Sequence, residues 1–266
     1  MRPPRPARVA LALGAGASKG FAHVGVIKVL EANRIPVDMI VGTSVGSFVG
    51  AIYAAGYDAY TLQKIAFAIE KSDIVDLTIP DNGFVKGEKI EEYVNRMVRN
   101  VPIERLRIPF YAVATDLQTG RETVFGKGNT GMAVRASCAI PGVFRPVRIG
   151  GRLFVDGGVA SPVPVEAARR LGADVVIAVD ISGGPEKALP ETTIETILRA
   201  VNIMYEELAA RELAKADVVI RPRVGQIGSG DFSKRHEAIL EGERAAQEAL
   251  PAIRAALEKL KAEGRI

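Results

Sequence analysis

The chain has 266 residues, of which 48% are hydrophobic and 25% are charged, and its formal net charge at pH 7 is +4. These values are typical of globular proteins and argue against a disordered chain. The excess positive charge is small and scattered, so it does not indicate nucleic-acid binding, although it is compatible with weak attraction to an anionic lipid surface. The single cysteine, Cys138, excludes an intrachain disulfide and suits the reducing cytoplasm in which we expect the protein.

At this length, one large domain is the simplest division of the chain. Residues 1–8 are rich in proline and arginine, and we predict a disordered tail there, followed by a single domain over residues 9–266. The start also resembles a signal peptide, but its apolar run is short and prolines precede it. The apolar stretch 39–56 contains several glycines and few large side chains, so it favours a strand, a turn and a helix over a membrane span.

Strand-like and helix-like segments alternate along the chain, which predicts an α/β fold with a mainly parallel sheet covered by helices on both faces. Predicted strands occupy residues 9–13, 37–41, 109–115, 122–125, 174–181 and 217–221, with a hairpin over 145–155. Predicted helices occupy residues 21–33, 47–55, 59–71, 88–100, 132–139, 192–214 and 236–262, the last kinked or divided at Pro251. Residues 72–87 show little periodicity and are predicted to form a loop or a mobile flap, and residues 182–190 a surface loop.

Ser44 is the first candidate nucleophile, because it lies between Gly42 and Gly46 after an apolar strand and before a small-residue helix. A serine in this context is the nucleophile-elbow pattern, in which a sharp turn exposes the hydroxyl above the sheet. Glycine on either side removes side chains that would collide in the turn. The amino end of the following helix favours negative charge that develops nearby.

A serine nucleophile needs a base, and the chain has only two histidines, His23 and His236. Neither follows a late strand, where the histidine of a conventional triad would lie, so we expect both to be structural. Asp156 is the better candidate base, since it ends a predicted strand and precedes Gly157 and Gly158, which allow a tight turn. A carboxylate serves as a base near neutral pH when partial desolvation raises its pKa. A simple turn-forming Asp-Gly-Gly is the alternative.

Residues 14–20 form a glycine-rich loop between the first strand and the first long helix. A dinucleotide-binding fingerprint requires a third glycine where Lys19 stands, and a phosphate-binding P-loop requires a Gly-Lys-Ser/Thr ending that is missing here. An oxyanion hole fits better, because consecutive small residues expose backbone amides beside a helix amino end. A generic strand-to-helix turn remains an alternative.

Taken together, these motifs resemble the patatin-like phospholipase family, over about residues 8 to 221. The matching residues are Gly14, Gly16, Lys19 and Gly20 of the loop, Ser44 of the elbow, Asp156-Gly157-Gly158, and the blocks 21–26 and 136–141. Ala15 departs from the pattern, since some members of the family carry glycine there, and this stiffens the loop slightly. Each motif is common by itself, whereas four in the right order on compatible elements are specific.

The resemblance implies a single three-layer α/β/α domain and hydrolysis of lipid acyl esters through a Ser-Asp dyad. By position, Ser44 is the nucleophile and Asp156 is its base. The loop supplies the oxyanion hole, with amides from Gly16 and Ala17 and with Lys19 orienting the loop or adding positive field. The whole site expected from the resemblance comprises Ser44, Asp156, Gly14, Ala15, Gly16, Ala17, Lys19, Gly20, Gly42, Gly46, Gly157 and Gly158, with no metal and no cofactor.

The substrate expected from this resemblance is a lipid or ester reached by transient contact with a membrane surface, and no nucleic acid is expected as a partner. We expect Phe48, Ile52, Ile140, Phe144 and residues 74–84 to line an acyl pocket. Three other interpretations stay open at this point. They are a non-enzymatic lipid- or protein-binding regulator on the same fold, a nucleotide-dependent protein, and a short-chain esterase or thioesterase.

Overall fold

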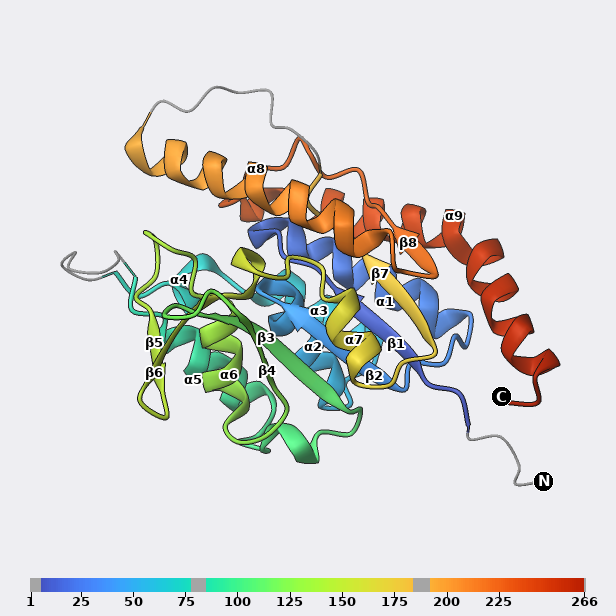
Figure 1. Cartoon of the computed structure of the whole chain (residues 1–266). Helices are drawn as coiled ribbons and strands as arrows, with labels where there is room; N and C mark the ends of the chain where they lie inside the picture. Colours follow the sequence, from blue (N-terminus) through green and yellow to red (C-terminus); the bar gives the residue numbers. More distant parts are fainter. Residues whose placement is uncertain (1–5, 78–84, 184–191, 266) are drawn as a thin grey trace.

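The computed structural model describes residues 6–77, 85–183 and 192–265, and its centre is one eight-stranded sheet (Figure 1). The strand order is β5-β6-β3-β2-β1-β7-β8, and β4 pairs with β3 beside this path. The strands are β1 (Val9–Leu13), β2 (Met39–Thr43), β3 (Phe110–Asp116), β4 (Glu122–Phe125), β5 (Val147–Ile149), β6 (Arg152–Asp156), β7 (Val175–Val179) and β8 (Val218–Ile220). Strands β3, β2, β1, β7 and β8 pair in parallel, whereas β4, β5 and β6 pair antiparallel. The sheet is therefore mainly parallel, as predicted, with an antiparallel part at one edge.

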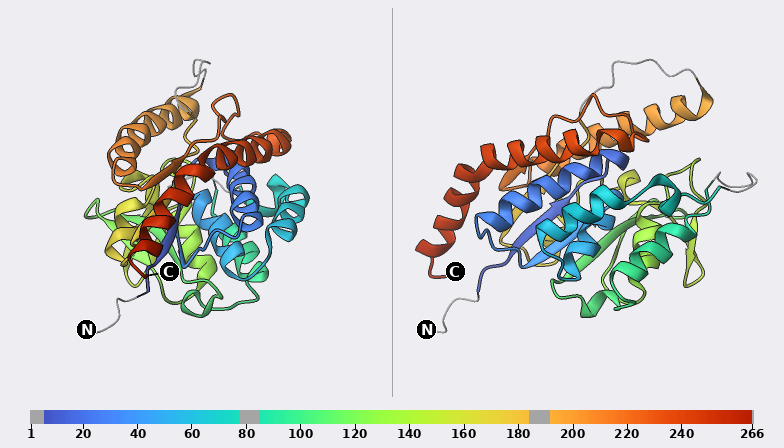
Figure 2. Two further views of the ribbon diagram at one scale, coloured as in Figure 1. Left: turned by 90° about the vertical axis from the view of Figure 1, so that its right-hand side faces the viewer. Right: turned by 180° about the vertical axis from the view of Figure 1, so that it is seen from behind.

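Helices cover both faces of the sheet, which confirms the predicted three-layer arrangement (Figures 1 and 2). The α-helices are α1 (Phe21–Ala32), α2 (Val45–Ala54), α3 (Ala59–Ala68), α4 (Lys71–Ile74), α5 (Glu88–Met97), α6 (Thr130–Ser137), α7 (Val165–Arg170), α8 (Thr193–Leu213) and α9 (Arg235–Ala262). Short 3-10 turns occupy η1 (Ala17–Gly20), η2 (Ile103–Arg105), η3 (Gly157–Val159) and η4 (Phe232–Lys234).

The two faces of β1 separate the hydrophobic core into two layers. Leu11 and Leu13 point into a large cluster with side chains of α1, α2, α3, α5 and α9. Ala10 and Ala12 point the other way, into a smaller cluster with α7 and α8. Successive side chains of a strand alternate between faces, so a continuously apolar strand of this kind can be buried on both sides.

Several element boundaries differ from the sequence-based expectations. Strand β2 lies two residues later than predicted and ends at Thr43, directly before Ser44. Helices α4 and α7 were not predicted; α4 is a single turn and α7 has six residues, too short for a clear hydrophobic period. Helix α9 runs through Pro251 without being divided, and it changes direction along its length (Figure 2).

The structure describes only parts of the predicted tail (residues 1–8) and of the predicted flap (residues 72–87). The predicted disorder does not extend to residues 6–8, because Ala7 is buried and its amide donates to the Arg265 carbonyl at 2.8 Å. Residues 1–5 lie outside the described residues, as do residues 78–84 of the predicted flap. On either side of the latter, Leu77 and Val85 form an antiparallel bridge. Within the described residues, no helix combines the length and apolar character needed to cross a membrane.

Helices α1 and α9 cross so closely that glycine is required on both. A Cβ added to Gly25 of α1 would lie 2.0 Å from the Ile239 carbonyl oxygen, and one added to Gly242 of α9 would lie 2.0 Å from the Ala22 carbonyl oxygen. Backbone atoms cannot give way as a flexible side chain can. The two glycines therefore set the distance between these helices, which lie side by side in Figure 2.

We expect Gly25→Ala to destabilise the protein by about 1–3 kcal/mol, because the added methyl group forces α1 and α9 apart. The direction of this change in stability is informative, because a glycine-to-alanine substitution inside an unobstructed helix stabilises a protein by roughly 0.5–1 kcal/mol. Urea unfolding monitored by circular dichroism measures the difference. Gly228→Ala is the matched control, because its Cβ would have its nearest neighbour at 3.9 Å. Equal stability of the two variants would contradict the close crossing.

Candidate active site

Ser44 occupies a strained turn between β2 and α2. Its backbone has φ 54° and ψ −127°, a region that residues other than glycine rarely adopt. Such strain is maintained only where the surroundings enforce it, and it is commonest at functional sites. A Cβ on Gly46 would lie 2.1 Å from the Leu13 carbonyl oxygen, and one on Gly42 would lie 2.5 Å from the Gly46 carbonyl oxygen. The turn therefore accepts no side chain at either flanking position.

Ser137 holds this turn in place from α6. The Ser44 amide donates to Ser137 Oγ at 2.8 Å, and Ser137 Oγ in turn donates to the Val113 carbonyl oxygen at 2.5 Å. A buried hydroxyl thus connects the elbow to β3, at the place where the β2–β3 ladder has ended. Ser137 lies in the 136–141 block noted in the sequence, but its role in supporting the elbow was not predicted.

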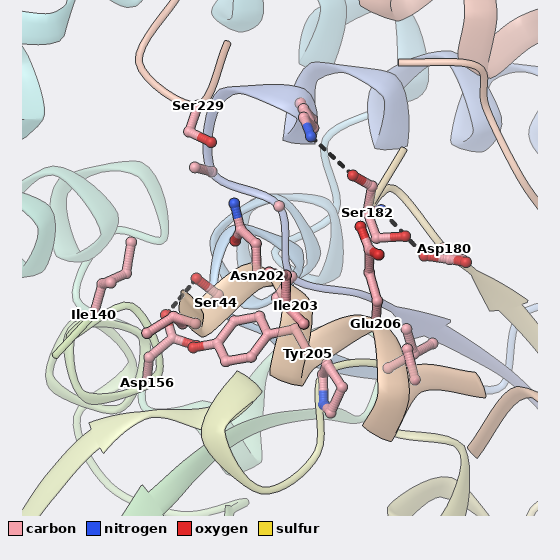
Figure 3. A pocket seen from close by; sticks show the side chains of 18 of the residues that line it. Ser44, Ile140, Asp156, Asp180, Ser182, Asn202, Ile203, Tyr205, Glu206 and Ser229 are labelled. Carbon is pink, nitrogen blue, oxygen red and sulfur yellow. Dashed lines mark hydrogen bonds between the residues drawn. The ribbon is translucent and has the colours of Figure 1, made fainter. Parts of the chain in front are cut away.

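The structure brings Ser44 and Asp156 together although 112 residues separate them (Figure 3). Ser44 Oγ donates to Asp156 Oδ2 at 2.6 Å, and both residues are buried. Asp156 ends β6, where its amide donates to the Ala139 carbonyl oxygen at 2.8 Å. Its second oxygen, Oδ1, accepts hydrogen bonds from the Gly158 amide at 2.8 Å and from Tyr205 Oη at 3.3 Å.

The surroundings of Asp156 raise its proton affinity. Burial is the main cause and raises the pKa of Asp156 to about 6, because a charged carboxylate is disfavoured away from water. The hydrogen bonds from Ser44, Gly158 and Tyr205 act in the opposite direction, since they favour the ionised form. At neutral pH the carboxylate is ionised but holds a proton far better than an exposed aspartate does.

The glycine loop lies against the carboxyl ends of β1 and β7. Its course is fixed by the Gly14 amide, which donates to the Val179 carbonyl oxygen at 3.0 Å, and by the Ala15 amide, which donates to the Pro162 carbonyl oxygen at 2.9 Å. Ala17 has a positive φ of 50°. In the described part of the chain, the amides of Gly16 and Ala17 donate to no protein acceptor, and both residues line a cavity together with Ser44.

Lys19 is a buried residue of the same loop. Its Nζ donates to the Ser182 carbonyl oxygen at 2.8 Å, in the segment that follows β7. This bond joins the loop to the neighbouring segment. Gly20 leaves room at the start of α1, because a Cβ there would lie 2.2 Å from the Val45 side chain.

Both histidines are accounted for by contacts away from Ser44. His23 is fully buried, and its Nε2 lies 2.8 Å from the Gly14 carbonyl oxygen. Burial lowers the pKa of His23 to about 4, so the ring is neutral at pH 7 and Nε2 carries the proton that it donates to Gly14. His236 lies in the first turn of α9 and stacks on Phe67 with ring centroids 5.9 Å apart. In residues 6–77, 85–183 and 192–265, no group of three or more His, Cys, Asp or Glu side chains could hold a metal ion.

Two cavities meet at Ser44. The larger, of about 460 Å³, is almost entirely apolar and includes the predicted residues Phe48, Ile52, Ile140 and Phe144. Ile74, Val75 and Leu77 also line it, whereas residues 78–84 of the predicted flap lie outside the described residues. The smaller cavity, of about 160 Å³, is more polar and lies beneath α8. Its walls include the glycine loop, Asp156, Asp180, Asn202, Tyr205 and Glu206 (Figure 3).

Tyr205 was not predicted as a site residue. It lies in the middle of α8, where the sequence signalled only a long helix. Its ring packs over η3, since a Cβ on Gly158 would lie 2.3 Å from Tyr205 Cε2. No local motif marks this residue, and only the packing of α8 over the sheet reveals it.

We expect the neutral state of His23 to make the protein less stable in mild acid. The folded pKa of about 4 is below the ordinary 6.5, so the unfolded chain binds the proton first and stability falls as the pH drops below 6.5. Between pH 7.5 and pH 5 this loss amounts to about 2 kcal/mol. His23→Gln does not titrate, so its stability deficit relative to the wild type should shrink by that amount at pH 5. Denaturant unfolding of both proteins at the two pH values measures it.

Asp156 and Glu212 contribute pH dependence of the opposite sign, because burial raises the pKa of each. Both groups are present in the wild type and in His23→Gln, so their contributions cancel in the comparison. A deficit that stays constant between the two pH values would show that His23 is not neutral in the folded protein.

Comparison with known proteins shows the family to which the chain belongs. Residues 11–169 match the patatin-like phospholipase family. An NTE family protein of Mycobacterium tuberculosis is 38% identical over 219 residues, which are 77% of this chain and 60% of the relative. The human patatin-like phospholipase domain-containing protein 6 is 35% identical over 189 residues, or 68% of this chain and 14% of the human protein. The chain thus spans less than two thirds of the mycobacterial relative and about one seventh of the human one.

Solved structures share the fold at low sequence identity. VipD from Legionella pneumophila superposes with a TM-score of 0.55 at 13% identity, covering 95% of this chain and 67% of VipD. ExoU from Pseudomonas aeruginosa, in its complex with SpcU, superposes with a TM-score of 0.54 at 14% identity, covering 96% of this chain and 53% of that one. From the family match and the identity of its relatives, we conclude that the chain belongs to the patatin-like phospholipase family.

Proposed function

We propose that this protein is a serine acyl hydrolase that cleaves ester bonds of phospholipids or related lipids, with Ser44 as nucleophile and Asp156 as its base. The observation that carries the proposal is the 2.6 Å hydrogen bond between Ser44 Oγ and the buried Asp156 carboxylate, in a strained elbow. Family membership supports lipid hydrolysis in general. The assignment of roles to these residues is our own.

In the mechanism that we propose, Asp156 Oδ2 takes the proton of Ser44 Oγ as this oxygen attacks the ester carbonyl carbon. The oxygen of the tetrahedral intermediate accepts hydrogen bonds from the amides of Gly16 and Ala17, which have no other acceptor in the described part of the chain. When the ester C–O bond breaks, Asp156 returns the proton to the leaving alcohol. Asp156 then deprotonates a water molecule, which attacks the acyl carbon on Ser44. As the bond between this carbon and Ser44 Oγ breaks, Asp156 returns the proton to Ser44 Oγ and the fatty acid is released.

The two cavities suggest how the substrate lies. The apolar cavity of about 460 Å³ suits a long acyl chain, and this size favours a lipid over a short-chain ester or thioester. The polar cavity beneath α8 suits the alcohol side of the ester. Leu77 is 78% exposed at the edge of the apolar cavity, which supports transient contact with a lipid surface.

We expect a fluorophosphonate to form one covalent adduct on the wild type, visible in the intact mass, and none on Ser44→Ala. Asp156→Asn should reduce the labelling rate by about 10²-fold or more, because the amide cannot accept the serine proton. His236→Gln is the control and should be labelled as the wild type is. A folded wild type that takes no label would favour the rival proposal of a binding protein without catalysis, and fast labelling of Asp156→Asn would exclude the dyad.

The apolar cavity leads to a second prediction, on the acyl-chain length of the substrate. Ile65 lines this cavity from α3, and Ile65→Trp should fill part of it. Hydrolysis of palmitoyl esters should fall about tenfold relative to butyryl esters, because the longer chain loses buried contact. Tyr60→Trp is the matched control on the same helix, since Tyr60 is exposed. An unchanged ratio in Ile65→Trp would show that the acyl chain binds elsewhere.

A further inference from the structure

The two oxygens of the Asp156 carboxylate make different contacts. Oδ2 faces Ser44 and is the atom that would accept its proton. Oδ1 points the other way and is held by the Gly158 amide at 2.8 Å and by Tyr205 Oη at 3.3 Å. The orientation of Oδ2 toward the serine therefore depends on what holds Oδ1.

Tyr205 reaches this oxygen from a separate element of the fold. It lies on α8, whereas Asp156 and Gly158 belong to β6 and η3. The tyrosine ring lies against Gly158, and the ring extends from the helix toward the carboxylate (Figure 3). Only glycine at position 158 leaves space for the ring, because any Cβ there would overlap it.

Building on the proposed function, we propose that Tyr205 is a positioning residue of the reaction, which holds Asp156 Oδ1 from α8 so that Oδ2 faces Ser44. The hydroxyl donates to a buried carboxylate, and a hydrogen bond to a charged group in such surroundings is stronger than one in water. The bond also favours the ionised form of Asp156, which is the form that can take the serine proton. Helix α8 thereby contributes to the reactive state of the dyad.

The ionisation of Asp156 can be observed separately from its neighbours. Among the described residues, Asp156 is faced by the titratable groups of Tyr205, from α8, and of Cys138, from the segment after α6. Burial raises the pKa of the Tyr205 phenol well above its ordinary value and also raises the pKa of the Cys138 thiol. Both groups stay neutral between pH 5 and pH 8. Burial also raises the pKa of Glu212 on α8 to about 7, but this group is present in both proteins, so a displacement of the acidic limb between them reports on Asp156.

The test is the rate of fluorophosphonate labelling as a function of pH in the wild type and in Tyr205→Phe. We expect the acidic limb of Tyr205→Phe to move upward by about one pH unit, because the ionised carboxylate loses a donor. Labelling should fall several-fold more at pH 6 than at pH 8.5, because the displaced limb adds to any loss of positioning at the lower pH. Tyr57→Phe is the matched control, since it removes a hydroxyl that donates to the Met97 carbonyl oxygen at 2.8 Å, and its limb should not move.

Replacement of Tyr205 by 3-fluorotyrosine tests the hydrogen bond while the ring and its hydroxyl stay in place. Its hydroxyl is a stronger donor, so the acidic limb should move to lower pH, opposite to its movement in Tyr205→Phe. A uniform loss of rate at every pH, with an unmoved limb in both variants, would reduce Tyr205 to a packing residue and overturn the proposal.

A failure of the proposed function would appear differently, as a wild type that takes no label at any pH. The proposal on Tyr205 is then decided by direct titration. Carbon-13 spectra of the aspartate carboxyls, with Asp156→Asn to assign the signal, give the pKa of Asp156 in the wild type and in Tyr205→Phe. A higher pKa in the variant supports the proposal, and equal values reject it.

Discussion

Strand β3 is the element on which the arrangement of the site depends. It pairs in parallel with β2 on one side and antiparallel with β6 on the other. Its register places Val113 opposite Thr43 and Ala114 opposite Asp156. Ser44 follows Thr43 by one residue, so the serine and the aspartate reach the same level on opposite sides of β3. The change from parallel to antiparallel pairing within one sheet thus brings together two residues that are remote in sequence.

A buried carboxylate must be compensated, and the surroundings of Asp156 provide this from several elements. Ser44 and Gly158 donate to its side chain, and Thr115 Oγ1 donates to its backbone carbonyl at 2.9 Å. Ser137 fixes the elbow through two further hydrogen bonds. Each of these groups is satisfied without water in a region where an unpaired donor or acceptor would cost about 1–3 kcal/mol. The same burial gives Asp156 the proton affinity that a base requires near neutral pH.

The parts of this site that could be predicted are those with a local signal. The elbow around Ser44, the glycine loop and Asp156 each follow an apolar strand, and turn chemistry requires small residues beside them. Ser137, Thr115 and Tyr205 carry no such signal, because their partners are distant in sequence and only the strand register and helix packing bring them close. The hairpin of β5 and β6 was predicted from its glycine turn, whereas the short helices α4 and α7 were missed, since neither has a period long enough to distinguish it.

In the mechanism that we propose, a carboxylate base also limits how α8 can vary. A histidine titrates near neutrality without help, but the ring of His23 is already engaged with Gly14 behind the loop. An aspartate reaches a comparable pKa only when it is shielded from water. Tyr205 of α8 forms part of this shield around Asp156. Met204 of α8, by contrast, is exposed and does not line the polar cavity beneath this helix. The inward face of this helix is therefore tied to the proposed chemistry, although nothing in its sequence alone distinguishes it from an ordinary surface helix.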